Sequence, residues 1–126
     1  MHENEIGTIL LDAAFQVHKE LGPGLLESTY EACLCFELAG MDLHVESQVP
    51  LPVVYKEVKL DCGYRIDLML ERKVIVELKV ADTLNDVHLA QMLTYMKLSG
   101  CKLGYLINFN VKQLRTGIKR VVLGNL

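Results

Sequence analysis

The chain has 126 residues, of which 51% are hydrophobic and 23% are charged, and its formal net charge is −3. This length and composition predict one globular domain, residues 1–126, and exclude a disordered or fibrous protein. No apolar run is long enough to span a membrane and the first residues lack the basic region of a secretory signal, so we expect a cytoplasmic protein.

Two amphipathic helices are predicted in the first third of the chain. Apolar residues from Ile6 to Leu21 recur at helical spacing, which predicts a helix over residues 3–20 that Gly22-Pro23-Gly24 ends. A second helix is predicted over residues 26–38, with Gly40 at its end.

Strands dominate the rest of the chain, with one further helix over residues 86–98 that Gly100 closes. Pro50 and Pro52, in the predicted strand over residues 49–55, indicate an edge or irregular strand. The order ααβββαββ predicts an α+β fold, an α/β sandwich in which helices pack on a mixed sheet. The predicted strands cover residues 49–55, 58–60 (continuing or returning the first strand), 64–70, 74–80, 103–109 and 118–123.

The charges and the cysteines give weaker indications. Residues 1–50 hold nine acids and a single base, whereas the chain from Lys97 onward holds six bases and no acid. A basic end beside an acidic site would suit a polyanion, although a solvated basic edge explains the pattern equally well. The cysteines form no CxxC pair, which favours buried reduced thiols over a zinc site: Cys33, Cys35, Cys62 and Cys101.

The register of the hairpin over residues 64–80 follows from its hydrophobic pattern. Alternate residues are apolar from Ile66 to Leu70 and from Val74 to Val80, and both sets must reach one core. This requires a pairing centred on Arg72 and a three-residue turn, Glu71-Arg72-Lys73. Asp67 then lies opposite Glu77, and Arg65 opposite Lys79, with paired Cβ atoms roughly 4.5–5.5 Å apart.

Asp67 and Glu77 are the candidate metal ligands. Carboxylates this close repel each other unless a cation lies between them, and oxygen ligands suit Mg²⁺. Lys79 lies on the same side of its strand as Glu77, where it could hold an attacking water or a phosphate, as metal-assisted phosphodiester cleavage requires. An ion-pair cluster on a solvated sheet face is the alternative. Gln91 and Tyr95, one helical turn apart, could line that open face or form a half-buried stripe.

These residues together resemble the PD-(D/E)xK nuclease superfamily, with Asp67 as the lone acid and Glu77-Leu78-Lys79 as the ExK motif; Ile66 stands where the superfamily often has proline. Gly24-x-x-Glu27-x-x-Tyr30 resembles the signature of the small prokaryotic GxxExxY proteins, a branch of that superfamily. The resemblance extends from about Ile6 to Val121 through further segments in the same order: Pro50-Leu51-Pro52-Val53, Tyr64-Arg65-Ile66-Asp67, Gln91-x-x-x-Tyr95 and Gly104-x-x-Ile107-Asn108-Phe109.

The resemblance implies a restriction-endonuclease-like fold and metal-dependent cleavage of nucleic acid, with DNA as the expected substrate. Asp67, Glu77 and the carbonyl of Leu78 would bind Mg²⁺ or Mn²⁺, and Glu27 would ligate through water or hold a second metal. Lys79 would orient the attacking water, and Gln91 would hydrogen-bond a water or a phosphate oxygen. A plain helix-surface acid is the alternative for Glu27, and a salt bridge to Glu77 or Glu27 is the alternative for Lys79.

Supporting roles are expected for two tyrosines. Tyr30 is predicted to pack its helix on the sheet and to form a hydrogen bond through its hydroxyl. Tyr95 is predicted to pack against Glu27 or hold Lys79, and simple core packing fits equally well. His18 is expected to be structural, and His88 could border the site.

A non-catalytic nucleic-acid-binding or assembly module on the same fold is the alternative to a nuclease. A domain this small rarely encloses a duplex alone, which is compatible with a homodimer.

Overall fold

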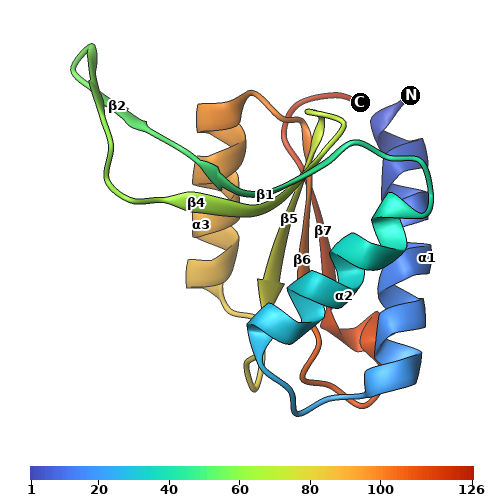
Figure 1. Ribbon diagram of the computed structural model, residues 1–126. Helices are drawn as coiled ribbons and strands as arrows, with labels where there is room; N and C mark the ends of the chain where they lie inside the picture. Colours follow the sequence, from blue (N-terminus) through green and yellow to red (C-terminus); the bar gives the residue numbers. More distant parts are fainter.

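Three α-helices, a five-stranded sheet and a separate two-stranded hairpin form the protein in the computed structural model, which describes residues 1–126 (Figure 1). The helices begin and end close to the predicted positions, because apolar periodicity and flanking glycines define them locally. The elements in chain order are α1 (Glu3–Leu21), α2 (Glu27–Ala39), β1 (Val45–Pro50), β2 (Val53–Tyr55), β3 (Val58–Leu60), β4 (Arg65–Leu70), β5 (Val74–Lys79), α3 (Asp86–Ser99), β6 (Leu103–Asn108), a short 3-10 helix (Leu114–Gly117) and β7 (Ile118–Val122).

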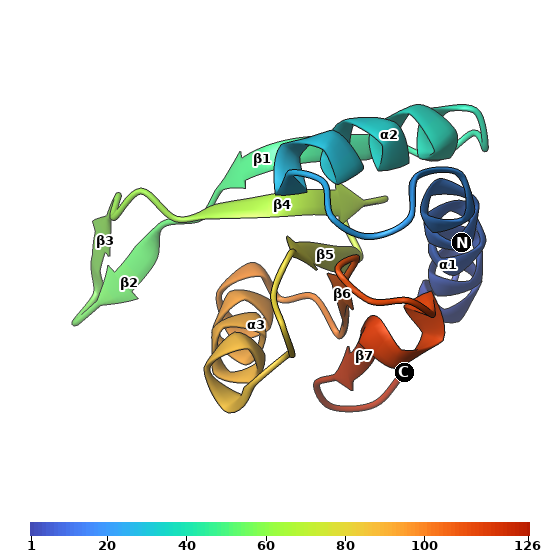
Figure 2. The same ribbon diagram turned by 90° about the horizontal axis from the view of Figure 1, so that it is seen from below.

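Helices cover both faces of the five-stranded sheet (Figure 2). On one face, α1 and α2 pack against the sheet through a core that includes Leu10 and Leu34. On the other face, α3 packs through a second core that includes Met92, Met96 and Ile75. The structure is therefore the predicted α/β sandwich, and it is consistent with a restriction-endonuclease-like fold.

The strand order in this sheet is β1-β4-β5-β6-β7. β5 and β6 run parallel and are connected by α3, whereas all other neighbours are antiparallel. Gly104 on β6 permits the close approach of α3, since an added Cβ atom there would lie 2.6 Å from the sulfur of Met92. This packing holds α3 beside the carboxyl end of β5, where Lys79 pairs with Asn108 of β6.

The predicted hairpin register is confirmed. β4 and β5 pair Leu68 with Val76 and Leu70 with Val74, which centres the turn on Arg72. Glu71 and Arg72 have φ angles of 52° and 56°, and these left-handed conformations close the three-residue turn.

One residue of the hairpin lies on a different face from the one predicted. Ile66 does not share the core of Leu68 and Leu70 but packs in the second core, on the side of α3. The ladder between β1 and β4 omits a pair between Gln48 and Asp67, and Gln48 has a φ angle of 52°. This local irregularity interrupts the alternation of sides along β4 at Asp67.

The strand predicted over residues 49–55 is in fact two strands in two sheets. β1 ends at Pro50 in the main sheet, and β2 pairs only with β3, in a hairpin that projects from the body of the protein (Figure 1). Proline lacks a backbone N–H, so Pro50 and Pro52 interrupt ladder pairing between the two segments. Residues 58–60 therefore return the chain rather than continue it.

All four cysteines are unpaired. Cys101 is buried, and Cys33 and Cys35 are half-buried, but Cys62 is exposed, against the prediction. Cys62 follows β3 in the projecting hairpin, outside both cores. No helix combines the length and the apolar character needed to cross a lipid bilayer.

Candidate active site

The two predicted acids meet where β4 and β5 separate. The last ladder pair is Leu68 with Val76, and beyond it two side-chain hydrogen bonds join the strands. The backbone N–H of Asp67 donates to Oε2 of Glu77 at 2.8 Å, and the N–H of Leu78 donates to Oδ2 of Asp67 at 2.8 Å. Each carboxylate is thus held by the backbone of the opposite strand, which brings the two acids together.

The predicted pairing of Arg65 with Lys79 is absent. Arg65 pairs with Pro50 of β1, and its guanidinium lies 3.8 Å from the carboxylate of Asp61. Lys79 pairs with Asn108 of β6. The two strands have already separated at Asp67, so the ladder does not extend to these residues.

Glu77 is an acid buried in an otherwise apolar layer, with only 3% of its surface exposed. Burial, and then the nearby Asp67 carboxylate, raise the pKa of Glu77 to about 8, although Lys79 acts in the opposite direction. Without a cation, Glu77 therefore retains its proton at neutral pH. The alternative of an ion-pair cluster on a solvated sheet face is excluded, because α3 covers this face.

Glu27 approaches the two acids from the first turn of α2 but remains exposed. Partial burial, followed by Asp67, raises the pKa of Glu27, and the ammonium of Lys79 offsets part of this rise. No hydrogen bond connects Glu27 to either residue. Its link to the site is therefore electrostatic rather than a direct hydrogen bond.

Two polar residues that the sequence analysis did not identify adjoin the site. The amide of Gln48 donates to Oε1 of Glu31 at 2.7 Å and to Oδ1 of Asp67 at 3.3 Å. Glu31 lies one turn after Glu27 on the same helix face, so its position could have been found from i, i+4 spacing. The approach of Gln48 depends on its left-handed backbone, which no sequence pattern indicated.

Lys79 and Gln91 are in contact, as the predicted site requires. The Nζ of Lys79 donates to Oε1 of Gln91 at 3.3 Å. Lys79 makes no salt bridge, which argues against the alternative role for this residue. The position of α3, which carries Gln91, is fixed at its start by reciprocal hydrogen bonds between Asn85 and His88. His88 therefore belongs to the cap of this helix, and the only hydrogen bond of its side chain is with Asn85.

Tyr30 positions the loop that leads to Glu27. Its ring stacks on that of Phe109, with 4.5 Å between the ring centroids, and its hydroxyl donates a hydrogen bond to the carbonyl of Gly22 at 2.6 Å. The same hydroxyl accepts a hydrogen bond from the N–H of Leu25 at 3.2 Å. The spacing of the glycine, the acid and the tyrosine in this motif thus has a structural reason: the tyrosine fixes the turn that orients the acid.

Tyr95 belongs to the second core rather than to the hydrogen-bonded site. It is 5% exposed, and its ring packs edge-on against that of Tyr64, with 6.0 Å between the ring centroids and an interplanar angle of 64°. It forms no hydrogen bond with Lys79, so the core-packing alternative holds. His18 is likewise structural: it is buried, and its Nε2 lies 2.7 Å from the carbonyl of Val111.

The donor chemistry of this site fits a hard divalent cation. Asp67, Glu77 and the carbonyl of Leu78 supply oxygen atoms, and the Asp67 carboxylate helps to raise the pKa of Glu77, an effect that a bound cation would oppose. No three His, Cys, Asp or Glu side chains are already gathered at metal-binding distance. In the metal-free structure one oxygen of each carboxylate accepts a backbone N–H at 2.8 Å.

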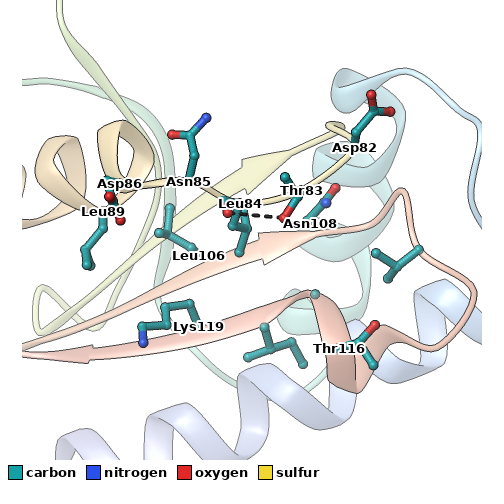
Figure 3. A pocket seen from close by; sticks show the side chains of 13 residues that line it. Asp82, Thr83, Leu84, Asn85, Asp86, Leu89, Leu106, Asn108, Thr116 and Lys119 are labelled. Atoms are coloured by element: carbon teal, nitrogen blue, oxygen red, sulfur yellow. Dashed lines mark hydrogen bonds between the residues drawn. The ribbon is translucent and has the colours of Figure 1, made fainter.

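The basic carboxyl-terminal segment does not lie beside these acids. Lys119 and Arg120 are on β7, which β6 separates from β5, and Arg120 donates to Asn4 of α1 at 2.6 Å. A cavity of about 500 Å³ lies next to Lys119 and contains none of the predicted site residues (Figure 3). Its lining includes Asp82 and Asp86, so it does not form a basic surface.

The chain is similar to a known protein family. Residues 4–121 match the family model of the PD-(D/E)XK nuclease superfamily. No curated protein and no solved structure matches the chain.

Proposed function

The chain belongs to the PD-(D/E)XK nuclease superfamily, and from this premise we propose that it is a metal-dependent nuclease that hydrolyses phosphodiester bonds of DNA. The observation that carries the proposal is the reciprocal pair of hydrogen bonds between Asp67 and the Glu77-Leu78 backbone. These bonds hold two carboxylates together at a place where one of them is almost fully buried. A pair of acids in this position is costly without a cation, which supports a metal-binding role.

The metal ligands in this proposal are Asp67, Glu77 and the carbonyl of Leu78, with Mg²⁺ or Mn²⁺ as the ion. Glu27 would act through a bound water or hold a second ion, since it is exposed and makes no direct contact. The bound ion would lower the pKa of a coordinated water and neutralise charge on the phosphate. Glu77 would release its proton as the ion binds.

Lys79 and Gln91 would position the water and the substrate. The ammonium of Lys79 is half-buried and is held by Gln91 rather than neutralised by an acid. A cation in this state can bind a phosphate oxygen and stabilise the charge that develops on it. Gln91 retains its amide N–H groups, which can donate to a second phosphate oxygen or to the water.

A non-catalytic assembly module is the competing function, because each acid already has a backbone hydrogen-bond donor without any metal. Calorimetric titration with Mn²⁺ separates the two. We expect wild type to bind Mn²⁺ and Asp67→Asn to lose most of that binding, since the amide retains the acceptor for the Leu78 N–H but not the charge. Asp12→Asn, an equal charge change on the exposed side of α1, is the matched control. A wild-type protein that neither binds Mn²⁺ nor cleaves DNA would refute the nuclease proposal.

A further inference from the structure

An uncharged groove adjoins the candidate active site. It lies between α3 and the base of the projecting β2–β3 hairpin, and it has a volume of about 490 Å³. All of its lining side chains are uncharged, so it offers no acid that would repel a polyanion. Its volume is within the ~300–1,000 Å³ range of small-molecule sites. Its lining includes Val53, Tyr64, Val87, Gln91 and Thr94.

The groove shares Gln91 with the candidate active site, and a second lining residue is close to that site in the sequence. Gln91 lines the groove and also accepts the hydrogen bond from Lys79 at 3.3 Å. Tyr64 directly precedes β4, the strand that carries Asp67. A molecule in the groove would therefore lie one side chain away from the ammonium of Lys79.

Tyr64 presents an aromatic surface in this groove. The residue is 44% exposed, although its ring contacts Tyr95. The 64° angle between the two rings means that they do not stack, so at least one face of Tyr64 is not covered by Tyr95. An accessible aromatic face beside apolar walls is the arrangement on which unpaired nucleobases stack.

We propose that this groove binds an unpaired nucleobase of single-stranded DNA, stacked on Tyr64, next to the phosphate at Lys79. The proposal rests on the proposed nuclease function, and it adds the form of the substrate. A base in a duplex is already stacked and paired and cannot enter a groove of this kind without being flipped out. The amide of Gln91 and the hydroxyl of Thr94 could hydrogen-bond the edge of the base.

The test is fluorescence anisotropy in EDTA, with a short labelled oligonucleotide as a single strand and annealed to its complement. Wild type is expected to bind the single strand more tightly than the duplex. Tyr64→Ala should weaken single-strand binding about tenfold, or about 1.4 kcal/mol, because the variant loses the aromatic ring on which the base stacks. Tyr64→Phe should bind as wild type does, since it retains the ring.

Two further variants keep the test decisive. Tyr55→Ala, on the exposed hairpin and outside the groove, is the matched control and should bind normally. Ala90→Phe fills the groove from the exposed side of α3 without removing a core residue, and it should weaken binding even if Tyr64→Ala folds poorly.

Several results would overturn the inference: tighter binding of the duplex, unchanged single-strand binding in both Tyr64→Ala and Ala90→Phe, or an equal loss in Tyr55→Ala. A loss of binding in the groove variants that size-exclusion chromatography traces to dissociation of a dimer would assign the groove to self-association and overturn the inference. Because the assay contains no free metal, it is independent of catalysis. If the protein cleaves DNA but fails this binding test, the proposed nuclease function stands and only the role of the groove is refuted.

Discussion

Replacement of Glu77 by glutamine should stabilise the metal-free protein at neutral pH. Glu77 is 3% exposed, and its pKa is raised from 4.5 to about 8, first by burial and then by Asp67. The folded state therefore binds the proton more tightly than the unfolded state. The stability linked to this proton is fully present below pH 4.5 and is lost as the pH rises towards 8.

The expected effect at pH 7 follows from this interval. Between 4.5 and 7 the unfolded carboxyl is ionised while the folded one is mostly protonated. About 2.5 pH units at about 1.36 kcal/mol each give a loss of about 3 kcal/mol in the free energy of unfolding. Glu77→Gln mimics the protonated acid and can still accept the Asp67 N–H, so it should recover this amount, or about 10 °C in melting temperature.

Urea denaturation of wild type and Glu77→Gln in EDTA, from pH 4.5 to pH 8, measures this difference. The two proteins should have similar stability at the acid end and should diverge as the pH rises. Glu20→Gln, at an exposed position on α1, is the control and should follow the wild-type curve. With saturating Mn²⁺ the wild type should gain stability and Glu77→Gln should not, because ligand binding stabilises only the protein that binds it.

Parallel pH curves for wild type and Glu77→Gln would refute this reasoning. They would mean that the carboxyl of Glu77 is as easily ionised in the folded protein as in the unfolded chain. The argument for a cation between Asp67 and Glu77 would then lose its energetic basis.

Two more substitutions test the site and its support. Lys79→Ala should abolish Mn²⁺-dependent cleavage of a plasmid or a single strand while the circular dichroism spectrum stays unchanged, because the only hydrogen bond of the Lys79 ammonium is to Gln91 and it forms no salt bridge. Cleavage that survives in the purified variant would contradict the assigned role. Tyr30→Phe should lower the free energy of unfolding by about 1–3 kcal/mol, since it removes the hydroxyl that bonds Gly22 and Leu25 inside the protein. An unchanged urea midpoint would show that the hydroxyl does not fix this loop.

The active-site pairing could be predicted because it depends on local pattern. The alternation of apolar residues on β4 and β5 specified the register, and the register placed Asp67 beside Glu77. Ile66 was misplaced by the same reasoning, because an irregularity involving Gln48 on another strand changes the side to which it points. The apolar pattern of β4 and β5 did not indicate this irregularity, which lies in the pairing of β4 with β1.

The burial of the site could not be read from the residues. Asp67, Glu77 and Lys79 have the composition of a solvated surface, and only the packing of α3 on that face makes Glu77 a buried acid with a raised pKa. The contacts made by Gln48 and Glu31 also depend on how β1 and α2 meet at Asp67.

The sequence by itself determined the helices, the strands of the central hairpin and the identity of the acids, since these depend on periodicity, turn residues and side-chain chemistry within short segments. The tertiary structure alone decided which acid is buried, that Lys79 hydrogen-bonds to Gln91 of a distant helix and where the uncharged groove opens. The physical reason is that desolvation and proximity depend on residues brought together from distant parts of the chain, and a linear pattern specifies neither.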